Sequence, residues 1–322
     1  MKVAVTGGTG FIGRRLVDRH VQAGDSVRVL SRRSASGFPD VVEVFPGDLT
    51  NESTALSAFV EGADVLYHCA AELRDASRMR RVQVAGTERL LRAAVGKIGR
   101  WVQLSSVGVY GPVKSGLVTE SSPTRPVGEY ETTKCEAERL IAGAVAIEAL
   151  DAVVLRPSNV FAPEMPSSGL FRLTGLIKKR RFAYIGKPGA IANYIHVDNV
   201  VGALLLCATS PEARGATYNL SDWRTLERFV AVAAEALGVS SPSWRIPEPV
   251  ARGVAWVLGA AWDFPLTPAR IDALTTRAIY DASKIERELG YRHHIALEPA
   301  LEQTVRAWHG SAARFRPHPQ VP

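Results

Sequence analysis

A short apolar strand that runs directly into a glycine-rich turn restricts the fold of this chain more than any other feature. Residues 3–6 predict a buried strand, the segment Gly7-Gly8-Thr9-Gly10-Phe11-Ile12-Gly13 follows it, and residues 11–23 have the periodicity of a helix. Glycines allow a tight turn and a close approach of the backbone to a pyrophosphate, and the start of a helix supplies free N–H donors. The pattern from Gly8 to Gly13, in its strand–turn–helix setting, therefore predicts a dinucleotide site. The residues expected to contact the dinucleotide here are Gly7, Gly10, Phe11, Ile12 and Gly13.

Short apolar runs and helical patterns alternate over the first half of the chain. The runs that predict strands are residues 3–6, 26–30, 41–45, 64–68, 101–105 and 152–156, and the helical patterns are residues 11–23, 53–60, 78–95 and 130–146. Several of these strands are unbroken runs of Val, Leu and Ala, as expected of strands buried on both faces of a parallel sheet. The alternation predicts an α/β fold with a doubly wound parallel sheet of the Rossmann type.

Prolines and glycines become frequent after Pro157, and the alternation of strands and helices weakens there. We therefore expect a smaller, C-terminal substrate-binding subdomain. The predicted boundaries are residues 1–165 for the dinucleotide-binding domain, with residues 193–222 returning to it, and residues 166–192 and 223–309 for the smaller subdomain. Residues 310–322, with three prolines and no apolar periodicity, are expected to be a flexible tail.

Composition and charge narrow the class of protein further. The 322 residues are 46% hydrophobic and 22% charged, an ordinary balance for a soluble globular protein. The formal charge of +7 favours anionic ligands, but the cations are scattered rather than interleaved with aromatics, so we expect no nucleic-acid partner. Cys69, Cys135 and Cys207 lack the spacing of a metal site or a disulfide framework, so no metal is expected. Neither a signal peptide nor an apolar run long enough to cross a membrane is visible, so a cytoplasmic protein is expected.

The end of the second predicted strand indicates which dinucleotide is bound. NAD sites usually place an acidic residue there, hydrogen-bonded to the 2′-hydroxyl of the ribose. This chain has Arg32 and Arg33 instead, which could pair with a 2′-phosphate. NADP is therefore favoured over NAD, although both arginines could also be ordinary solvated loop residues.

Three polar residues predict acid–base chemistry beside this site. Tyr130 and Lys134 are four residues apart at the start of a predicted helix, which puts both side chains on one face. A nearby ammonium favours the phenolate, so we expect Lys134 to lower the pKa of Tyr130 and make it a proton shuttle. Ser106 ends a predicted parallel strand, where active sites of α/β proteins lie, and could hold a substrate oxygen beside Tyr130. A Tyr–Lys pair at this spacing is also common by chance, and Ser106 alone could be an ordinary strand-end hydroxyl.

Taken together, these residues resemble the extended short-chain dehydrogenase/reductases, in their NAD-dependent epimerase/dehydratase branch. The motifs that carry the resemblance are, in chain order, Thr6-Gly7-Gly8-Thr9-Gly10-Phe11-Ile12-Gly13, Gly47-Asp48-Leu49, His68-Cys69-Ala70-Ala71, Leu104-Ser105-Ser106-Val107-Gly108-Val109-Tyr110-Gly111, Tyr130 with Lys134, Leu155-Arg156-Pro157-Ser158-Asn159-Val160, Tyr194-Ile195-His196-Val197-Asp198-Asn199 and Asp281-Ala282-Ser283-Lys284. They extend over nearly the whole chain and follow the order of the family's motifs.

The resemblance implies an enzyme that moves a hydride between a nicotinamide and a secondary alcohol or ketone. It implies that Ser106, Tyr130 and Lys134 are catalytic, that Tyr130 handles the hydroxyl proton, and that Lys134 also holds the nicotinamide ribose. The further cofactor contacts that it implies are Asp48, Leu49, Ala70 and Pro157, and the substrate contacts are Ser106, Asn159 and Tyr194. We also expect a homodimer.

The resemblance leaves the substrate open between two classes. Asn159 matches a residue that contacts the diphosphate in sugar-nucleotide epimerases, which suggests a hydroxyl or keto carbon of a diphosphate-linked sugar, carried on a nucleotide or on a polyprenyl lipid. Ala192 stands where those enzymes often have an arginine, and a later Arg-Pro-Gly-Asp segment is missing, which weakens an ordinary uridine-diphosphate sugar. The alternative is an NADPH-dependent reductase or dehydrogenase of a bulky apolar ketone or alcohol, as in the hydroxysteroid dehydrogenase and flavonol reductase branches.

The apolar stretch at residues 250–266 is consistent with either a lipid-carried sugar or an apolar substrate. Its Trp256, Trp262 and Phe264 could line an apolar site or touch a membrane, but such a stretch is more often simply a buried helix, and that is the expectation here. A peripheral membrane contact is therefore left open. A non-catalytic nucleotide sensor is a third hypothesis, which is disfavoured because the three catalytic candidates are all present.

Overall fold

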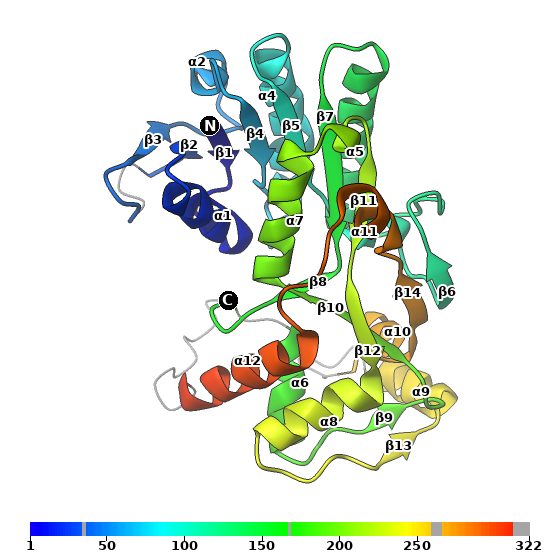
Figure 1. Ribbon diagram of the computed structural model, residues 1–322. Helices are drawn as coiled ribbons and strands as arrows, with labels where there is room; N and C mark the ends of the chain where they lie inside the picture. The colour runs from blue at the N-terminus through cyan, green and yellow to red at the C-terminus, as the bar shows by residue number, and fades with distance from the viewer. Residues whose placement is uncertain (34–36, 167–168, 259–265, 312–322) are drawn as a thin grey trace.

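A seven-stranded parallel sheet organises the larger part of the protein (Figure 1). The computed structural model describes residues 1–33, 37–166, 169–258 and 266–311. The strands of this sheet are β1 (Lys2–Thr6), β2 (Ser26–Ser31), β3 (Val42–Pro46), β4 (Val65–His68), β5 (Arg100–Leu104), β7 (Ala152–Pro157) and β11 (Thr217–Leu220). They lie in the order β11-β7-β5-β4-β1-β2-β3, and every neighbouring pair is parallel. The chain leaves β1 toward β2 and β3 on one side and returns to β4 on the other, so the strand order reverses beside β1.

Helices cover both faces of this sheet. The helices of one face are α1 (Phe11–Gln22), α7 (Val197–Thr209) and α11 (Ser283–Leu289), and those of the other face are α2 (Leu56–Val60), α4 (Gly86–Ala94) and α5 (Glu129–Ala146). Successive residues of β1 alternate between the two faces of the sheet. Val3 and Val5 pack toward α1 and α7, while Ala4 packs toward α2 and α4. The doubly wound parallel fold expected from the sequence is confirmed.

A smaller lobe is built around a three-stranded sheet, which lies below the large sheet in Figure 1. Its strands are β8 (Asn159–Phe161), β10 (Ile191–His196) and β12 (Asp222–Thr225), and the helices that share its hydrophobic core are α6 (Gly169–Lys178), α8 (Leu226–Ala236) and α12 (Leu297–Ser311). Two short parallel pairs complete the sheet structure, namely β9 (Tyr184–Ile185) with β13 (Arg245–Ile246) and β6 (Ser115–Val118) with β14 (Arg277–Tyr280). The remaining helices are α3 (Ala76–Met79), α9 (Glu248–Leu258) and α10 (Pro268–Thr275), with short 3-10 turns at Val107–Tyr110 and Pro211–Ala213.

The main difference from the expected elements is the long helix at residues 78–95. The structure divides this region into α3, a π-helical turn at Arg80–Ala85 and α4. A π turn holds one extra residue per turn, and hydrophobic periodicity alone does not reveal it. Near the C-terminus, α12 runs to Ser311, two residues into the segment expected to be a tail, and residues 312–322 lie outside the described residues. Among the described residues, no helix has both the length and the apolar composition needed to cross a membrane.

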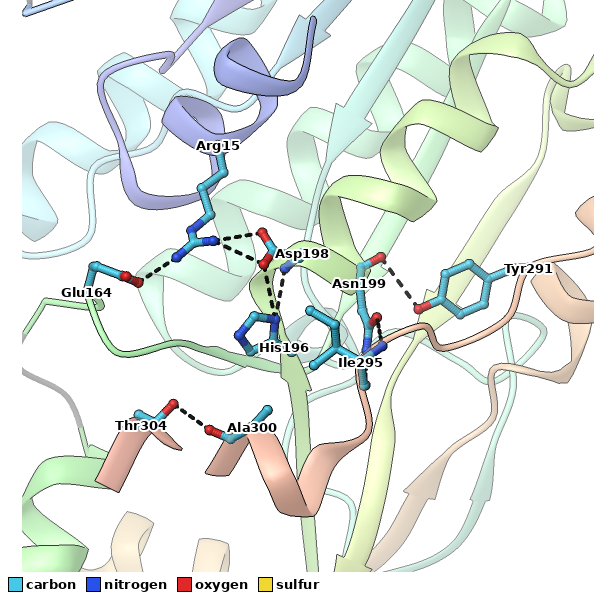
Figure 2. A network of polar contacts seen from close by, with 9 residues as sticks. All are labelled: Arg15, Glu164, His196, Asp198, Asn199, Tyr291, Ile295, Ala300 and Thr304. Atoms are coloured by element: carbon cyan, nitrogen blue, oxygen red, sulfur yellow. Dashed lines mark hydrogen bonds and ion pairs between the residues drawn. The ribbon is translucent and has the colours of Figure 1, made fainter. Parts of the chain in front are cut away.

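An ion-pair network joins α1 to α7 and to the segment after β8, close to the glycine turn (Figure 2). Arg15, on α1, contacts both carboxylate oxygens of Asp198 at 2.8 and 3.0 Å, and its other terminal nitrogen donates to Glu164 at 2.5 Å. Asp198 lies in the first turn of α7, and Glu164 follows β8. The Asn199 side chain donates to the carbonyl of Ile295 at 2.7 Å, just before α12. The start of α1 is therefore held against both α7 and the entry to the smaller lobe.

A second network is buried between β7 and α5. The Arg156 guanidinium makes a two-point ion pair with Glu138, at 3.0 and 2.5 Å, and donates to the Tyr110 hydroxyl at 2.7 Å. Tyr110 in turn donates to Asn219 on β11 at 2.8 Å. Because a buried charge is costly unless it is paired and hydrogen-bonded, this network fixes α5 against the end of the sheet.

Candidate active site

A cavity of about 700 Å³ opens at the carboxyl ends of the strands of the large sheet. Its walls come from the segments that follow β1, β2, β3, β4, β5 and β7, together with the first two turns of α5. Ligands of open parallel sheets bind at this edge, where the strand order reverses, and here the reversal lies between β1 and β4. The cavity is therefore the candidate active site.

The glycine turn forms one wall of the cavity. Its backbone packs so closely against neighbouring backbone that a side chain at Gly7 or Gly13 would not fit. Gly7 has a φ of +71°, and a Cβ atom there would lie 2.6 Å from the backbone nitrogen of Ala70. A Cβ atom at Gly13 would lie 2.2 Å from the carbonyl oxygen of Gly7. Gly10 precedes α1 without a side-chain cap, so the first N–H groups of the helix point to the cavity as donors for an anion. The five glycine-turn residues predicted to contact a dinucleotide all line the cavity, and the cradle fits a pyrophosphate.

The end of the cavity at β2 and β3 combines one cation with one carboxylate. Arg32, Asp48 and Leu49 line it, whereas Arg33 does not. Burial opposes ionisation of Asp48, but hydrogen bonds from the backbone N–H and the hydroxyl of Thr50, at 2.8 and 2.9 Å, outweigh it. Together with Arg32 and Arg78, they hold the pKa of Asp48 below its ordinary value. Arg32 itself makes no ion pair with the described residues, so its guanidinium is available to a bound anion.

The three catalytic candidates meet at the opposite half of the cavity, and Ala70 and Pro157 line it as well. Tyr130 and Lys134 come from α5, and Ser106 follows β5. The Lys134 ammonium lies 6.0 Å from the centre of the Tyr130 ring and donates to the carbonyl of Leu104 at 2.7 Å. The Ser106 hydroxyl accepts the backbone N–H of Gly108 at 3.1 Å, which leaves its own proton for another acceptor. The fold thus brings these side chains to one place, and their catalytic roles stay predictions.

Burial, rather than the neighbouring ammonium, dominates the ionisation of Tyr130. It raises the pKa of Tyr130 to about 12, and the Glu131 carboxylate adds to the effect. Burial also lowers the pKa of Lys134 to about 8, although Cys69 and Glu138 oppose that change. The net pKa of Tyr130 is therefore above its ordinary value rather than below it, because burial is the dominant cause, and the expected effect of Lys134 on the phenolate stays a prediction. Tyr130 is a neutral phenol near pH 7, the form that can donate a proton.

The two predicted substrate contacts of the smaller lobe have different places. Asn159 lines the cavity, and its side-chain nitrogen donates to the carbonyl of Asn193 on β10 at 3.0 Å. Tyr194 does not line the cavity. Its ring stacks on Phe229 at 4.6 Å between centroids and meets Phe161 edge-on at 6.1 Å, inside the core of the smaller lobe. The structure therefore brings Asn159 to the site and leaves Tyr194 away from it.

Ser105 is a site residue that the sequence analysis did not single out. Its side chain lines the cavity beside Ser106 and is only 3% exposed, and its hydroxyl has no hydrogen-bond partner among the described residues. Buried hydroxyls are nearly always hydrogen-bonded, so a lone one in a cavity wall is a candidate ligand contact. The sequence shows two adjacent serines at the end of a strand. It does not show that Ser105 is buried without a partner among the described residues while Ser106 accepts a hydrogen bond.

A chain of buried hydrogen bonds supports the site from behind. Gln83, in the π-helical turn, accepts the backbone N–H of Glu72 at 2.9 Å and donates to the hydroxyl of Thr133 at 3.0 Å. Glu72 lines the cavity, and Thr133 donates to backbone carbonyls of the first turn of α5, including that of Tyr130. The π-helical turn thus ties one cavity wall to the helix that carries the catalytic candidates. A glutamine within an apolar helical pattern gave no sign of this in the sequence.

His68 plays a similar part beneath the glycine turn. Burial lowers the pKa of His68 to about 3, with Lys134 acting in the same direction, so its ring is neutral. Its two ring nitrogens share hydrogen bonds with Thr6 at 2.6 Å and with Thr87 on α4 at 2.9 Å. The neutral imidazole therefore joins the end of β1 to the helix layer behind the sheet.

Comparison with known proteins decides the family. A model of the NAD dependent epimerase/dehydratase family matches residues 3–221. The chain belongs to this family. It is an enzyme of the extended short-chain dehydrogenase/reductase type, and members of the family bind a nicotinamide cofactor.

Relatives of this enzyme act on different classes of substrate. A 4-hydroxy-2-methyl-3-oxo-4-farnesyl-3,4-dihydroquinoline-1-oxide ketoreductase from Stigmatella aurantiaca is 31% identical, over 94% of this chain and 95% of its own. A UDP-glucose 4-epimerase from Vibrio cholerae is 25% identical, over 95% of each chain. Among solved structures, the dTDP-glucose 4,6-dehydratase DesIV from Streptomyces venezuelae with NAD bound is 25% identical, with a TM-score of 0.76 over 98% of this chain and 99% of its own.

The first prediction concerns Tyr130 as the proton donor. Tyr130→Phe keeps the ring and removes the transferable proton, so turnover should fall by about 10²-fold or more, the contribution typical of a general acid. Ser106→Ala should cost less, because it removes one hydrogen bond rather than the proton carrier. Steady-state kinetics and calorimetric binding of the dinucleotide measure both effects. Turnover above about a tenth of the wild-type rate in Tyr130→Phe, with normal binding, would show that the phenol takes no part.

The second prediction uses the lowered pKa of Lys134. Because the folded protein holds this proton less tightly than the unfolded chain, the ammonium costs stability below about pH 8, and the cost is relieved as the pH rises toward 10.5. Wild type should therefore gain stability over Lys134→Met between these pH values, by up to about 3 kcal/mol. Urea unfolding at several pH values measures the difference, with exposed Lys114→Met as the control. Parallel curves for wild type and Lys134→Met would contradict the burial argument.

Proposed function

We propose that this enzyme is an NADP(H)-dependent reductase, or in reverse a dehydrogenase, of a bulky apolar ketone or secondary alcohol. The observation that carries the proposal is the chemistry of the cavity beyond Ser106 and Tyr130. The apolar side chains of Leu73, Val82, Val160, Met165 and Pro166 line this part, beside the polar Glu72, Ser158 and Asn159. Among the described residues that line the cavity, the only cations are Arg32 and Lys134.

These two cations are poorly placed to hold a substrate diphosphate. Arg32 follows β2, at the opposite end of the strand order from β7, and Lys134 lies buried beside Tyr130 with its ammonium on Leu104. A diphosphate buried without a cation or a full set of donors is strongly disfavoured. Asn159, the expected diphosphate contact, donates one of its two amide N–H groups to Asn193 and is a neutral donor rather than a cation. A neutral, apolar substrate needs none of these groups.

The relatives support the same class. The ketoreductase of Stigmatella aurantiaca acts on a farnesyl-bearing bicyclic ketone, and it is more identical to this chain than the UDP-glucose 4-epimerase is. A 3 beta-hydroxysteroid dehydrogenase/Delta 5-->4-isomerase from Mycobacterium tuberculosis is 28% identical over 94% of this chain. A diphosphate-linked sugar remains the second candidate, because Asn159 lines the cavity and because the epimerase and dehydratase relatives act on such sugars.

The side chains of the site suit ketone reduction. When bound, the reduced nicotinamide supplies a hydride to the carbonyl carbon. Tyr130, a neutral phenol near pH 7, donates its proton to the carbonyl oxygen, so that the ketone gains one hydride and one proton and becomes an alcohol. The Ser106 proton is free to hydrogen-bond the same oxygen and to stabilise the negative charge that develops on it. Lys134 provides a positive charge 6.0 Å from the Tyr130 ring, which stabilises the phenolate left behind.

The proposed preference for NADPH rests on Arg32. This residue lines the β2 end of the cavity, where a ribose 2′-phosphate would lie, and it makes no ion pair with the described residues. Arg32→Asp should reverse the preference, because a carboxylate repels the 2′-phosphate and accepts from a 2′-hydroxyl. Calorimetry with NADPH and NADH measures the ratio of dissociation constants, with Arg33→Asp, outside the cavity wall, as the control. Tighter binding of NADH by the wild type would reject the NADP assignment.

The substrate class is tested with two panels and one pair of variants. With NADPH, wild type should reduce 3-ketosteroids or prenylated bicyclic ketones, followed by loss of the absorbance of reduced nicotinamide, and should not interconvert UDP-glucose and UDP-galactose. Leu73→Arg should raise KM for the apolar ketone at least about tenfold, since a cation would enter an apolar wall. Leu117→Arg, at an equally exposed leucine outside the cavity, should leave KM unchanged. Sugar interconversion with tightly retained cofactor would instead establish the epimerase.

A further inference from the structure

Helix α9 turns an uncharged face away from the protein. Its small residues Ala251 and Ala255 are buried against Ile185 of β9 and Ile271 of α10. At about 3.6 residues per turn, the opposite arc carries no charged side chain. The large residues of this arc are Val250, Val254, Trp256 and Val257, and they are 54%, 38%, 85% and 66% exposed. In the described part of α9, the helix is therefore buried through its alanines, while its larger side chains face outward.

Strand β13 extends this apolar surface. Arg245 lies over the ring of Tyr184, its partner in β9, at 4.8 Å, so it occupies the sheet face away from α9. Successive side chains alternate between the faces of a strand, which places Trp244 and Ile246 on the side that α9 covers. Trp244 is 80% exposed. We call Trp244, Ile246, Val250, Val254, Trp256 and Val257 the α9 patch, and Trp262 and Phe264 lie outside the described residues.

A basic run lies next to the α9 patch. The carbonyl of Trp244 accepts the backbone N–H of Tyr184 at 2.9 Å, three residues after the run Lys178-Lys179-Arg180-Arg181. All four residues of the run are exposed, and its last three make no ion pair with the described residues. The carboxylates nearest to the patch are already paired, Glu227 with Arg245, and Glu248 and Asp272 with Arg252. The surface beside the patch is therefore net positive.

From this juxtaposition we propose that the α9 patch and the basic run form a docking surface for an anionic lipid bilayer. Tryptophan places an apolar ring and a polar N–H together, which suits the boundary between headgroups and acyl chains. Apolar residues would enter that boundary while the lysine and arginine side chains contact acidic headgroups. Stable membrane attachment generally takes two such signals, and this surface has both.

A second copy of the chain fits this surface less well. A symmetric contact through the α9 patch would bring two basic runs toward each other, and like charges at an interface disfavour it. An acidic bilayer offers the complementary charge instead. If the proposed function holds, the same surface would place the enzyme at a bilayer in which an apolar ketone is dissolved. This link to the substrate rests on the proposed function, whereas the docking surface itself does not.

Sedimentation with vesicles tests the surface without any substrate or cofactor. Wild type should sediment with vesicles of phosphatidylcholine and phosphatidylglycerol, and much less with phosphatidylcholine alone or at high salt. Trp256→Ser should lower the partition coefficient at least tenfold, whereas Trp223→Ser, at an exposed tryptophan of β12, should not. Arg181→Glu should weaken binding and flatten its salt dependence, whereas Arg214→Glu, an exposed arginine elsewhere, should leave both unchanged.

Thermal melting shows whether these exposed substitutions leave the fold intact. If Trp256→Ser lowers vesicle binding only in part, the double variant Trp244→Ser with Trp256→Ser should lower it further. The proposal is overturned if wild type does not bind acidic vesicles, or if Trp256→Ser and Trp223→Ser lose binding equally. It is also overturned if light scattering shows that Trp256→Ser converts a dimer to a monomer while wild type ignores vesicles, since the patch would then hold a second copy. Vesicle binding without ketone reduction would reject the proposed function and leave the docking surface standing.

Discussion

The rest of the structure depends on the contact between the ends of β1 and β4. At Gly7 the backbone turns with a φ of +71° and lies so close to Ala70 that no side chain fits between them. Gly13 then packs against the carbonyl of Gly7, which sets the direction of α1 and aims its first N–H groups into the cavity. Because the strand order reverses at this point, the same contact creates the crevice that forms the candidate active site.

The groups around that crevice are fixed by buried hydrogen bonds and ion pairs rather than by apolar packing alone. Arg156 and Glu138 hold α5 against β7, and Gln83 ties the start of α5 to the cavity wall. Arg15 links α1 to α7 through Asp198 and to the entry of the smaller lobe through Glu164. Each of these partners would leave an unpaired buried or half-buried group if displaced, so the relative positions of cofactor cradle and catalytic candidates are narrowly set.

Burial gives this site its acid–base character. Removal from water raises the pKa of the Tyr130 phenol and lowers that of the Lys134 ammonium, so both groups are drawn toward their neutral forms. A neutral phenol beside a free Ser106 proton is suited to donating to a carbonyl oxygen. The proposed neutral substrate fits the same argument, because Arg32 and Lys134 are the only cations among the described residues that line the cavity.

The sequence by itself determined the doubly wound fold, the glycine cradle and the candidates Ser106, Tyr130 and Lys134. These follow from local periodicity, from the restricted geometry that only glycine allows, and from side-chain spacing along one helix. Tertiary structure alone decided the rest. It packed Tyr194 against a hydrophobic core, left the Ser105 hydroxyl in the cavity wall without a partner among the described residues, and turned the apolar face of α9 outward. Periodicity shows which side chains share a face, but whether that face meets a core, a ligand or the surface depends on segments far away in the chain.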